Sequence, residues 1–204
     1  MPHIDAPFRI ALGVILIAVF AVRMYGHSQT LKAGKIQWRE GKLNMTLRML
    51  AGVVGVAALW IYLIIPEWIM WASAPLPDWL RWTGVAIAAL GIALLAWVHR
   101  ELGRNFAATL HEREGQTLIT SGPYRRVRNP MYTSIYLLLI SFFLVSANWL
   151  IGAMWLGGFT LLMLSRVAKE EKLMAEKFGE QYKEWSTRTG RFLPKPRMNI
   201  NKHE

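Results

Sequence analysis

The sequence predicts an all-α integral membrane protein with five transmembrane helices. Of its 204 residues, 53% are hydrophobic and the mean hydropathy is +0.24, which excludes an ordinary soluble domain and a disordered chain. Several windows of about 18 or more residues are mostly apolar, and about 20 helical residues cross the hydrocarbon core. Lysine and arginine gather between these windows and after the last one, as they do in the loops of membrane proteins.

Each predicted span ends at residues that suit a membrane interface or a helix terminus. We expect spans at about 7–25, 47–65, 79–98, 132–146 and 149–167. Pro66 ends the second span because proline cannot continue a helix, and Gly84 and Gly91 allow the third to approach a neighbour closely. Asn148 leaves a very short turn, so the last two spans form an antiparallel hairpin. Residues 1–98 thus carry three spans. Residues 99–204 hold a loop at 99–131, two spans and a tail at 168–204.

The distribution of positive charge predicts the orientation. Six lysines and arginines lie within 23–48, six within 100–128 and ten within 166–202, out of 24 in the chain. These segments follow the odd-numbered spans, so all three lie on one side, which the positive-inside rule makes cytoplasmic. The N-terminus is then outside and the C-terminus cytoplasmic, in a multi-pass protein. The formal charge of +11 reflects this topology rather than nucleic-acid binding.

Several classes of site are excluded by what the sequence lacks. There is no cysteine, hence no disulfide, thiol nucleophile or cysteine metal site. No histidine and carboxylate spacing is typical of a metal site, so we expect none. Neither G-x-G-x-x-G nor G-x-x-x-x-G-K-[ST] occurs, which excludes the common soluble nucleotide-binding loops.

The segment 120–132 concentrates polar chemistry directly before the fourth span. A Gly-Pro turn is followed by Arg125, Arg126 and Arg128, then by Asn129 and Pro130. Proline suits the first turn of a helix and Asn129 suits its N-cap. Free N–H groups at a helix start, beside guanidinium groups, favour a carboxylate or phosphate. The alternative interpretation is a basic anchor beside a membrane helix, which is very common.

A second cluster of polar residues follows the fifth span. Arg166 and Glu170 are four residues apart and share a helix face, with Glu171 beside them. They are either a solvated ion pair or the lining of a cavity at the membrane boundary. An apolar stripe at helical spacing follows: Met174, Phe178, Tyr182 and Trp185. Gly179 interrupts it and marks a bend.

These motifs resemble the isoprenylcysteine carboxyl methyltransferase (ICMT) family and its short prokaryotic relatives. The run from Leu118 to Tyr132 resembles the signature G-P-Y-x-x-x-R-H-P-x-Y, and the residues at 166–173, 178–182 and 189–194 resemble the C-terminal signature. The match covers about 99–194. It implies an enzyme of a prokaryotic inner or plasma membrane, with residues 99–204 as its catalytic region. The enzyme would bind S-adenosylmethionine in a cytoplasmic pocket formed by the loop between the third and fourth spans, the last two spans and a C-terminal helix.

The resemblance also implies residue assignments. The cofactor-binding residues would be Leu118, Thr120, Gly122, Tyr124, Asn129, Tyr132, Glu170 and Glu171, and the catalytic residues Arg166, Glu170 and Arg128. The methionine end of the cofactor would contact Asn129, Tyr132 and Glu170, and its adenine would lie against 118–124. Asn129 stands where the family has histidine, and asparagine hydrogen-bonds but carries no charge.

The expected function is methyl transfer to a lipophilic acceptor, such as an isoprenylcysteine carboxylate or a similar small group, at the cytoplasmic membrane face. Partners would be that acceptor, small or prenylated, and membrane lipid. The alternatives are a phospholipid amine methyltransferase, an NADPH-dependent membrane reductase of the sterol type, and a non-enzymatic lipid-binding or partner-binding membrane protein. The sequence identifies neither the acceptor nor the oligomeric state.

Overall fold

The computed structural model describes residues 5–31, 42–103 and 117–196, so the middle of the predicted loop and the end of the tail lie outside the described residues. Within these ranges the chain is helical, with isolated β-bridges and no longer strand. The elements, in order, are α1 Ala6–Leu31, α2 Lys42–Ile64, η1 Pro66–Ala72, α3 Asp78–Leu102, η3 Gly122–Arg125, α4 Pro130–Ser146, α5 Trp149–Gly152, η4 Ala153–Gly157 and α6 Gly158–Arg188.

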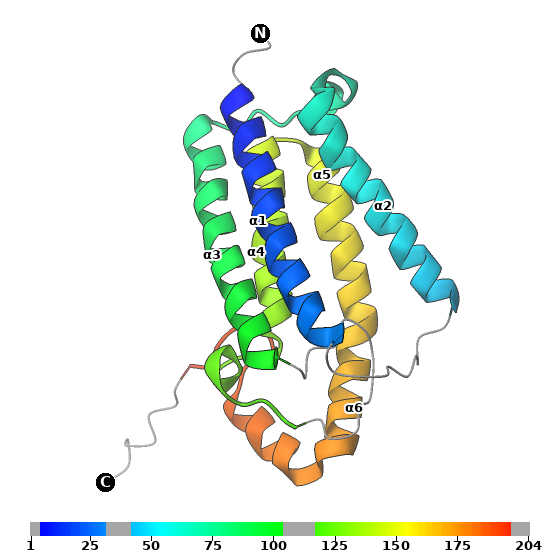
Figure 1. The fold of residues 1–204 in the computed structure, drawn as a ribbon, viewed down its shortest axis with the longest axis vertical. Helices are drawn as coiled ribbons and strands as arrows, with labels where there is room; N and C mark the ends of the chain where they lie inside the picture. Colours follow the sequence, from blue (N-terminus) through cyan, green and yellow to red (C-terminus); the bar gives the residue numbers. More distant parts are fainter. Residues whose placement is uncertain (1–4, 32–41, 104–116, 197–204) are drawn as a thin grey trace.

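The long helices form a bundle with their axes roughly aligned (Figure 1). Their inner faces meet in one apolar core, which includes Leu12 of α1, Leu59 of α2, Leu95 of α3, Leu138 of α4 and Ile151 of α5. Large apolar side chains also cover the outside, Ile17, Leu90 and Leu161 among them, each more than 60% exposed. An apolar exterior of this extent suits contact with lipid rather than water.

Among the described residues, three helices are long and apolar enough to cross a membrane: Ala6–Gln29, Asp78–Leu102 and Trp149–Arg188. A fourth span results if Gly52–Ile64 and Pro66–Ala72 are counted together, although these two bend by 109° at the proline. α4 is apolar but has only 17 residues. The protein is therefore an integral membrane protein with three to four apolar spans, and the five-span arrangement remains a proposal.

Polar contacts tie the bundle together at the end where α1 and α3 begin. Arg81 of α3 is only 5% exposed, and its guanidinium lies 3.7 Å from the ring centre of Phe8. It donates to Asp5 Oδ1 at 2.5 Å, to Val145 O at 3.0 Å and to Tyr62 Oη at 3.2 Å. A buried guanidinium is tolerated because each of its faces meets an acceptor or an aromatic ring.

The C-terminal helix differs from the predicted span 149–167. It runs on from α5 through the π-helical turn η4 and, as α6, continues to Arg188. The lysines and glutamates after residue 167 are good helix formers, so leaving the apolar region does not end the helix. Gly179 interrupts it with φ +53°, a conformation that glycine adopts without steric cost. Beyond this kink the chain turns back toward the bundle (Figure 1).

Candidate functional site

The site lies at the end of the bundle where α3 ends and α4 begins, here called the basic end. There η3 docks on the last turn of α3. Ser121 Oγ donates to Glu101 Oε2 at 2.7 Å. Gly122 has φ +55°, and a Cβ at this position would overlap the Glu101 side chain. Glycine at 122 therefore allows both the turn and the close approach to α3.

The segment after the kink is joined to the start of α4 by backbone hydrogen bonds, here called the clasp (residues 126–129 with 190–191). Arg128 N donates to Gly190 O at 2.7 Å, and Asn129 N donates to Arg191 O at 3.0 Å. In return, Gly190 N donates to Arg126 O at 3.0 Å. Two signatures about 60 residues apart in the chain thus meet edge to edge.

Side chains extend the contact on both sides of the clasp. Trp185 Nε1 donates to Tyr124 O at 3.1 Å, and Thr133 Oγ1 donates to Phe192 O at 2.7 Å. The end of α6 therefore contacts η3, and the segment after α6 contacts the first turn of α4.

Three predicted site residues meet beside the clasp. Glu170 accepts from Tyr132 Oη at 3.0 Å and from Arg166 at 2.9 Å. The side chains of Arg166 and Glu170 are 13% and 27% exposed, so the pair is partly shielded from solvent. The ring centres of Phe159 and Phe192 lie 5.8 Å and 6.4 Å from that of Tyr132. Aromatic side chains therefore pack beside the Tyr132, Arg166 and Glu170 cluster.

Glu171 anchors a second polar group facing the same segment. It accepts from Arg191 Nε at 3.0 Å and is also contacted by Arg191 Nη2. The Asn129 side-chain amide lies 3.5 Å from Glu171, and Arg128 Nε is 3.6 Å away, buried and without a hydrogen-bond acceptor among the described residues. The hydrogen bond from Arg191 raises the pKa of that arginine, so it stays charged. Arg128 also donates to Ser186 O at 3.0 Å.

Asn129 stands at the helix start that the sequence predicts for it. It occupies the N-cap of α4, but its side chain makes no capping hydrogen bond. Its amide donates instead to Arg191 O at 3.3 Å. The clasp brings the Arg191 carbonyl and the Glu171 carboxylate to this side chain, and both accept from its amide N–H groups.

The remaining predicted residues lie on the approach to the site. The Tyr124 ring is buried, and burial together with the nearby Glu170 charge raises the pKa of its phenol well above the usual range. Tyr124 therefore lies near Glu170, which Tyr132 and Arg166 also contact, and its phenol stays neutral. Leu118 is half-buried and Thr120 is exposed. These two precede η3 and are not linked by a described hydrogen bond to the charged residues.

The set of cofactor-binding and catalytic residues predicted from the sequence omitted Arg191. Its signal was present, because the Thr-Gly-Arg-Phe-Leu-Pro run forms part of the C-terminal signature. Its ion pair with Glu171 could not be predicted from the sequence spacing, since the two residues are twenty positions apart and meet only because the chain reverses at Gly179.

The two clusters of polar side chains, one around Glu170 and one around Glu171, together suit a zwitterionic ligand. Glu170 and Glu171 offer carboxylates to an ammonium group, while buried donors such as Arg128 Nε offer hydrogen bonds to a carboxylate. An amino-acid moiety carries both charges on one carbon. The donor set therefore fits the methionine end of S-adenosylmethionine.

Comparisons with known proteins concern the family and the fold. Residues 79–181, just over half the chain, match the family model described as phospholipid methyltransferase. Among curated proteins, none matches the chain. Among solved structures, the chain is similar to the eukaryotic intramembrane Ras methyltransferase ICMT, with a TM-score of 0.60 and 20% identity over 93% of this chain and 68% of that one. The resemblance inferred from the motifs is thus confirmed. The chain belongs to the phospholipid methyltransferase family of membrane enzymes, within which its fold is that of ICMT.

Proposed function

We propose that this protein transfers a methyl group from S-adenosylmethionine to a lipophilic acceptor at the cytoplasmic membrane face. The observation that carries the proposal is the contact of Glu170 with both Tyr132 and Arg166, at the point where α4 begins and α6 leaves the apolar region. The family and the solved relative support methyl transfer as the reaction class.

The cofactor would supply the activated methyl group on its sulfonium, and the protein would supply binding and orientation. Asn129, Tyr132 and Glu170 would bind its methionine end, with Glu171 beside them. Segment 118–124 would contact the adenine, with Leu118, Thr120 and Gly122 contributing side chains or backbone groups and Tyr124 a buried neutral ring.

Arg166 has a double use in this proposal. In the structure its guanidinium neutralises Glu170 at 2.9 Å. An ammonium group bound to Glu170 would replace that partner, and the guanidinium would then be available to the anionic end of an acceptor. Arg128, whose Nε is buried without an acceptor among the described residues, would act with it. Glu170 and Arg166, one helical turn apart, would thereby place cofactor and acceptor side by side.

Catalysis of this kind needs alignment rather than acid–base chemistry. A carboxylate or thiolate is already a nucleophile, so no general base is required. Orienting two reactants can lower a barrier by several kcal/mol, with about 7–11 kcal/mol as an upper range. The aromatic side chains of Phe159 and Phe192, packed near Tyr132, would help to exclude water.

The test is methyl transfer by the purified full-length protein, with isotope-labelled cofactor and membrane lipid extract as the acceptor source. Mass spectrometry of the labelled products identifies the acceptor: a base-labile methyl ester indicates a carboxylate, and a stable N-methyl group indicates an amine. We expect a labelled lipophilic product that is lost in Glu170→Gln and strongly reduced in Arg166→Gln. Glu176→Gln, an exposed carboxylate one and a half turns further along, is the matched control and should remain active. Equal activity in all three variants would refute the site assignment.

A further inference from the structure

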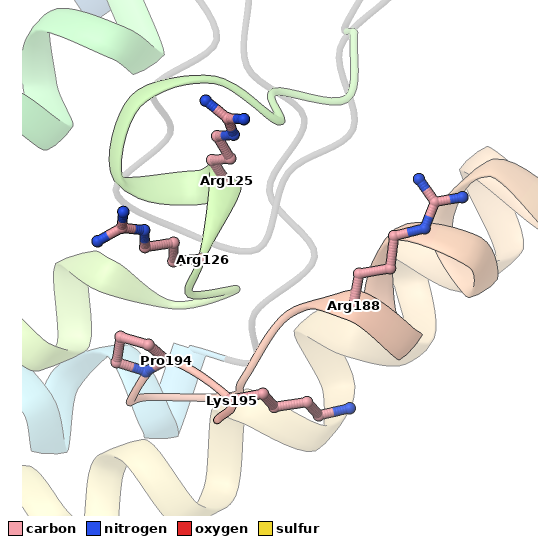
Figure 2. A pocket seen from close by; sticks show the side chains of 5 residues that line it. All are labelled: Arg125, Arg126, Arg188, Pro194 and Lys195. Carbon is pink, nitrogen blue, oxygen red and sulfur yellow. The ribbon is translucent and has the colours of Figure 1, made fainter. Parts of the chain in front are cut away.

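A second feature of the basic end lies apart from the candidate site: an open cleft of about 440 Å³ lined by cations. Its walls are Arg125, Arg126, Arg188, Pro194 and Lys195. Figure 2 shows that these residues come from the η3 loop, the end of α6 and the following tail. No carboxylate is among the described residues that line it. The size is within the range of small-ligand sites.

The cations in the cleft keep donors available for a ligand. Arg125 and Arg126 are exposed. Arg188 pairs with Glu184, but both side chains are about 70% exposed, and such pairs contribute little. Lys195 Nζ donates to Thr187 O at 2.9 Å and to Ser186 O at 3.5 Å, which leaves one of its three donors. An incoming anion would therefore meet several guanidinium donors without breaking a buried ion pair.

The backbone assembles the cleft in advance. Like charges repel, so four cations around one hollow need an independent cause for being together. The clasp is that cause: Gly190 N donates to Arg126 O, and Trp185 Nε1 donates to Tyr124 O, so the loop and the tail are joined whether or not an anion is present. A bound anion would relieve the repulsion and connect all three segments.

The position of the cleft relative to the membrane indicates the kind of anion. η3 rests on the last turn of α3, through Ser121 and Glu101, and α3 is long and apolar enough to cross a membrane. The cleft thus lies at the end of a candidate span, where the polar headgroup region begins. That region is about 5–8 Å thick on each side of the hydrocarbon core.

We infer that this cationic cleft binds a phosphate group, as borne by an anionic phospholipid headgroup or a small soluble phosphate ester. Guanidinium groups bind phosphate bidentately, which favours the two arginines of the loop as the principal contacts. The site does not depend on methyl transfer, because none of the lining residues is assigned to the cofactor or the acceptor. Its occupation would tighten the tail against η3.

The test is native mass spectrometry of the full-length protein in detergent, titrated with phosphatidylglycerol. The cleft variant Arg125→Gln with Arg126→Gln is compared with Lys169→Gln with Lys172→Gln, which removes the same charge from exposed positions of α6. We expect the first bound lipid to be weakened at least about fivefold in the cleft variant and less than about twofold in the control. Equal weakening in both would overturn the proposal.

Two further arms make the result decisive. Arg188→Gln, at an exposed helix end, should also weaken the first lipid, and it serves if the double variant does not fold. Competition by soluble glycerol phosphate identifies the source: displacement of the lipid shows a general phosphate site, and retention shows that the lipid headgroup in the membrane is required. An Arg188 variant that binds phosphatidylglycerol like the unsubstituted protein, together with unchanged binding in the loop variant, would exclude the cleft.

Discussion

Replacing Glu171 by glutamine should loosen the clasp without changing the shape of the site. Glu171 is 17% exposed and accepts from both Arg191 Nε and Arg191 Nη2, while Asn129 and Arg128 approach from the other side. Glutamine has the same size but no charge, and it offers Arg191 one acceptor oxygen where Glu171 offers two. The substitution therefore removes the charge from these contacts and leaves the packing in place.

The expected magnitude follows from the geometry. A hydrogen bond to a charged group contributes about 1.5–3 kcal/mol, and a neutral one about 0.5–1.5 kcal/mol. Arg191 is 51% exposed, so solvent screening reduces the difference for both of its contacts. We expect a net loss of about 1–1.5 kcal/mol in the local stability of the clasp. Since 1.4 kcal/mol is a factor of ten, the clasp should open roughly tenfold more often.

Amide hydrogen exchange measures this opening directly. The amides of Arg128, Asn129 and Gly190 make the clasp hydrogen bonds and should exchange about tenfold faster in Glu171→Gln. Glu180→Gln is the control, because that side chain is 87% exposed and pairs only with Lys183 three residues on. In Glu180→Gln the clasp amides should exchange within about twofold of their rate in the unsubstituted protein. The reasoning is refuted if the two variants protect the clasp equally.

Three shorter predictions concern the rest of the molecule. Gly26→Ala should lower the melting temperature in detergent, because its Cβ would lie 2.6 Å from His99 Cε1, whereas Gly13→Ala, with nothing within 4 Å, should not. Arg81→Leu should lower it further, since several buried acceptors lose their donor, and a melting temperature unchanged from the parent would contradict the network described. Because the pKa of Tyr124 is raised, folding favours the neutral phenol; that stability is complete below about pH 10, the unfolded pKa, and is lost as the pH rises further. Tyr124→Phe should therefore lose less stability between pH 8 and pH 11 than the parent, as measured by thermal unfolding.

The helices of the fold were largely accessible to sequence reasoning, since apolar windows and prolines mark where membrane helices lie. Pro66 and Pro130 stand at the start of η1 and α4, as their missing N–H groups require. The helical stripe at 174–185 and the bend at Gly179 were predicted as well, whereas the end of the last helix at Arg188 was not. The charged run after residue 167 suits both a helix and a tail, and the direction taken after Gly179 depends on a positive φ that the sequence only permits.

The candidate site was accessible in part for the same reason. The ion pair of Arg166 with Glu170 follows from their i, i+4 spacing and is confirmed. The contact of Tyr132 with Glu170 joins two helices, and resemblance rather than spacing pointed to it. The N-cap position of Asn129 was predicted correctly, but the acceptors of its side-chain amide come from the clasp, which is a tertiary feature.

The central claim is that the polar group around Glu170 binds a methyl-donating sulfonium cofactor. Isothermal titration calorimetry of the detergent-solubilised protein tests it most directly, with S-adenosylmethionine, its demethylated product and NADPH as the three titrants. The account predicts saturable heats for the first two, weakened at least about tenfold in Glu170→Gln and unchanged in Glu176→Gln, and none for NADPH. Binding of NADPH alone, or no binding of either sulfonium compound or product, would contradict it.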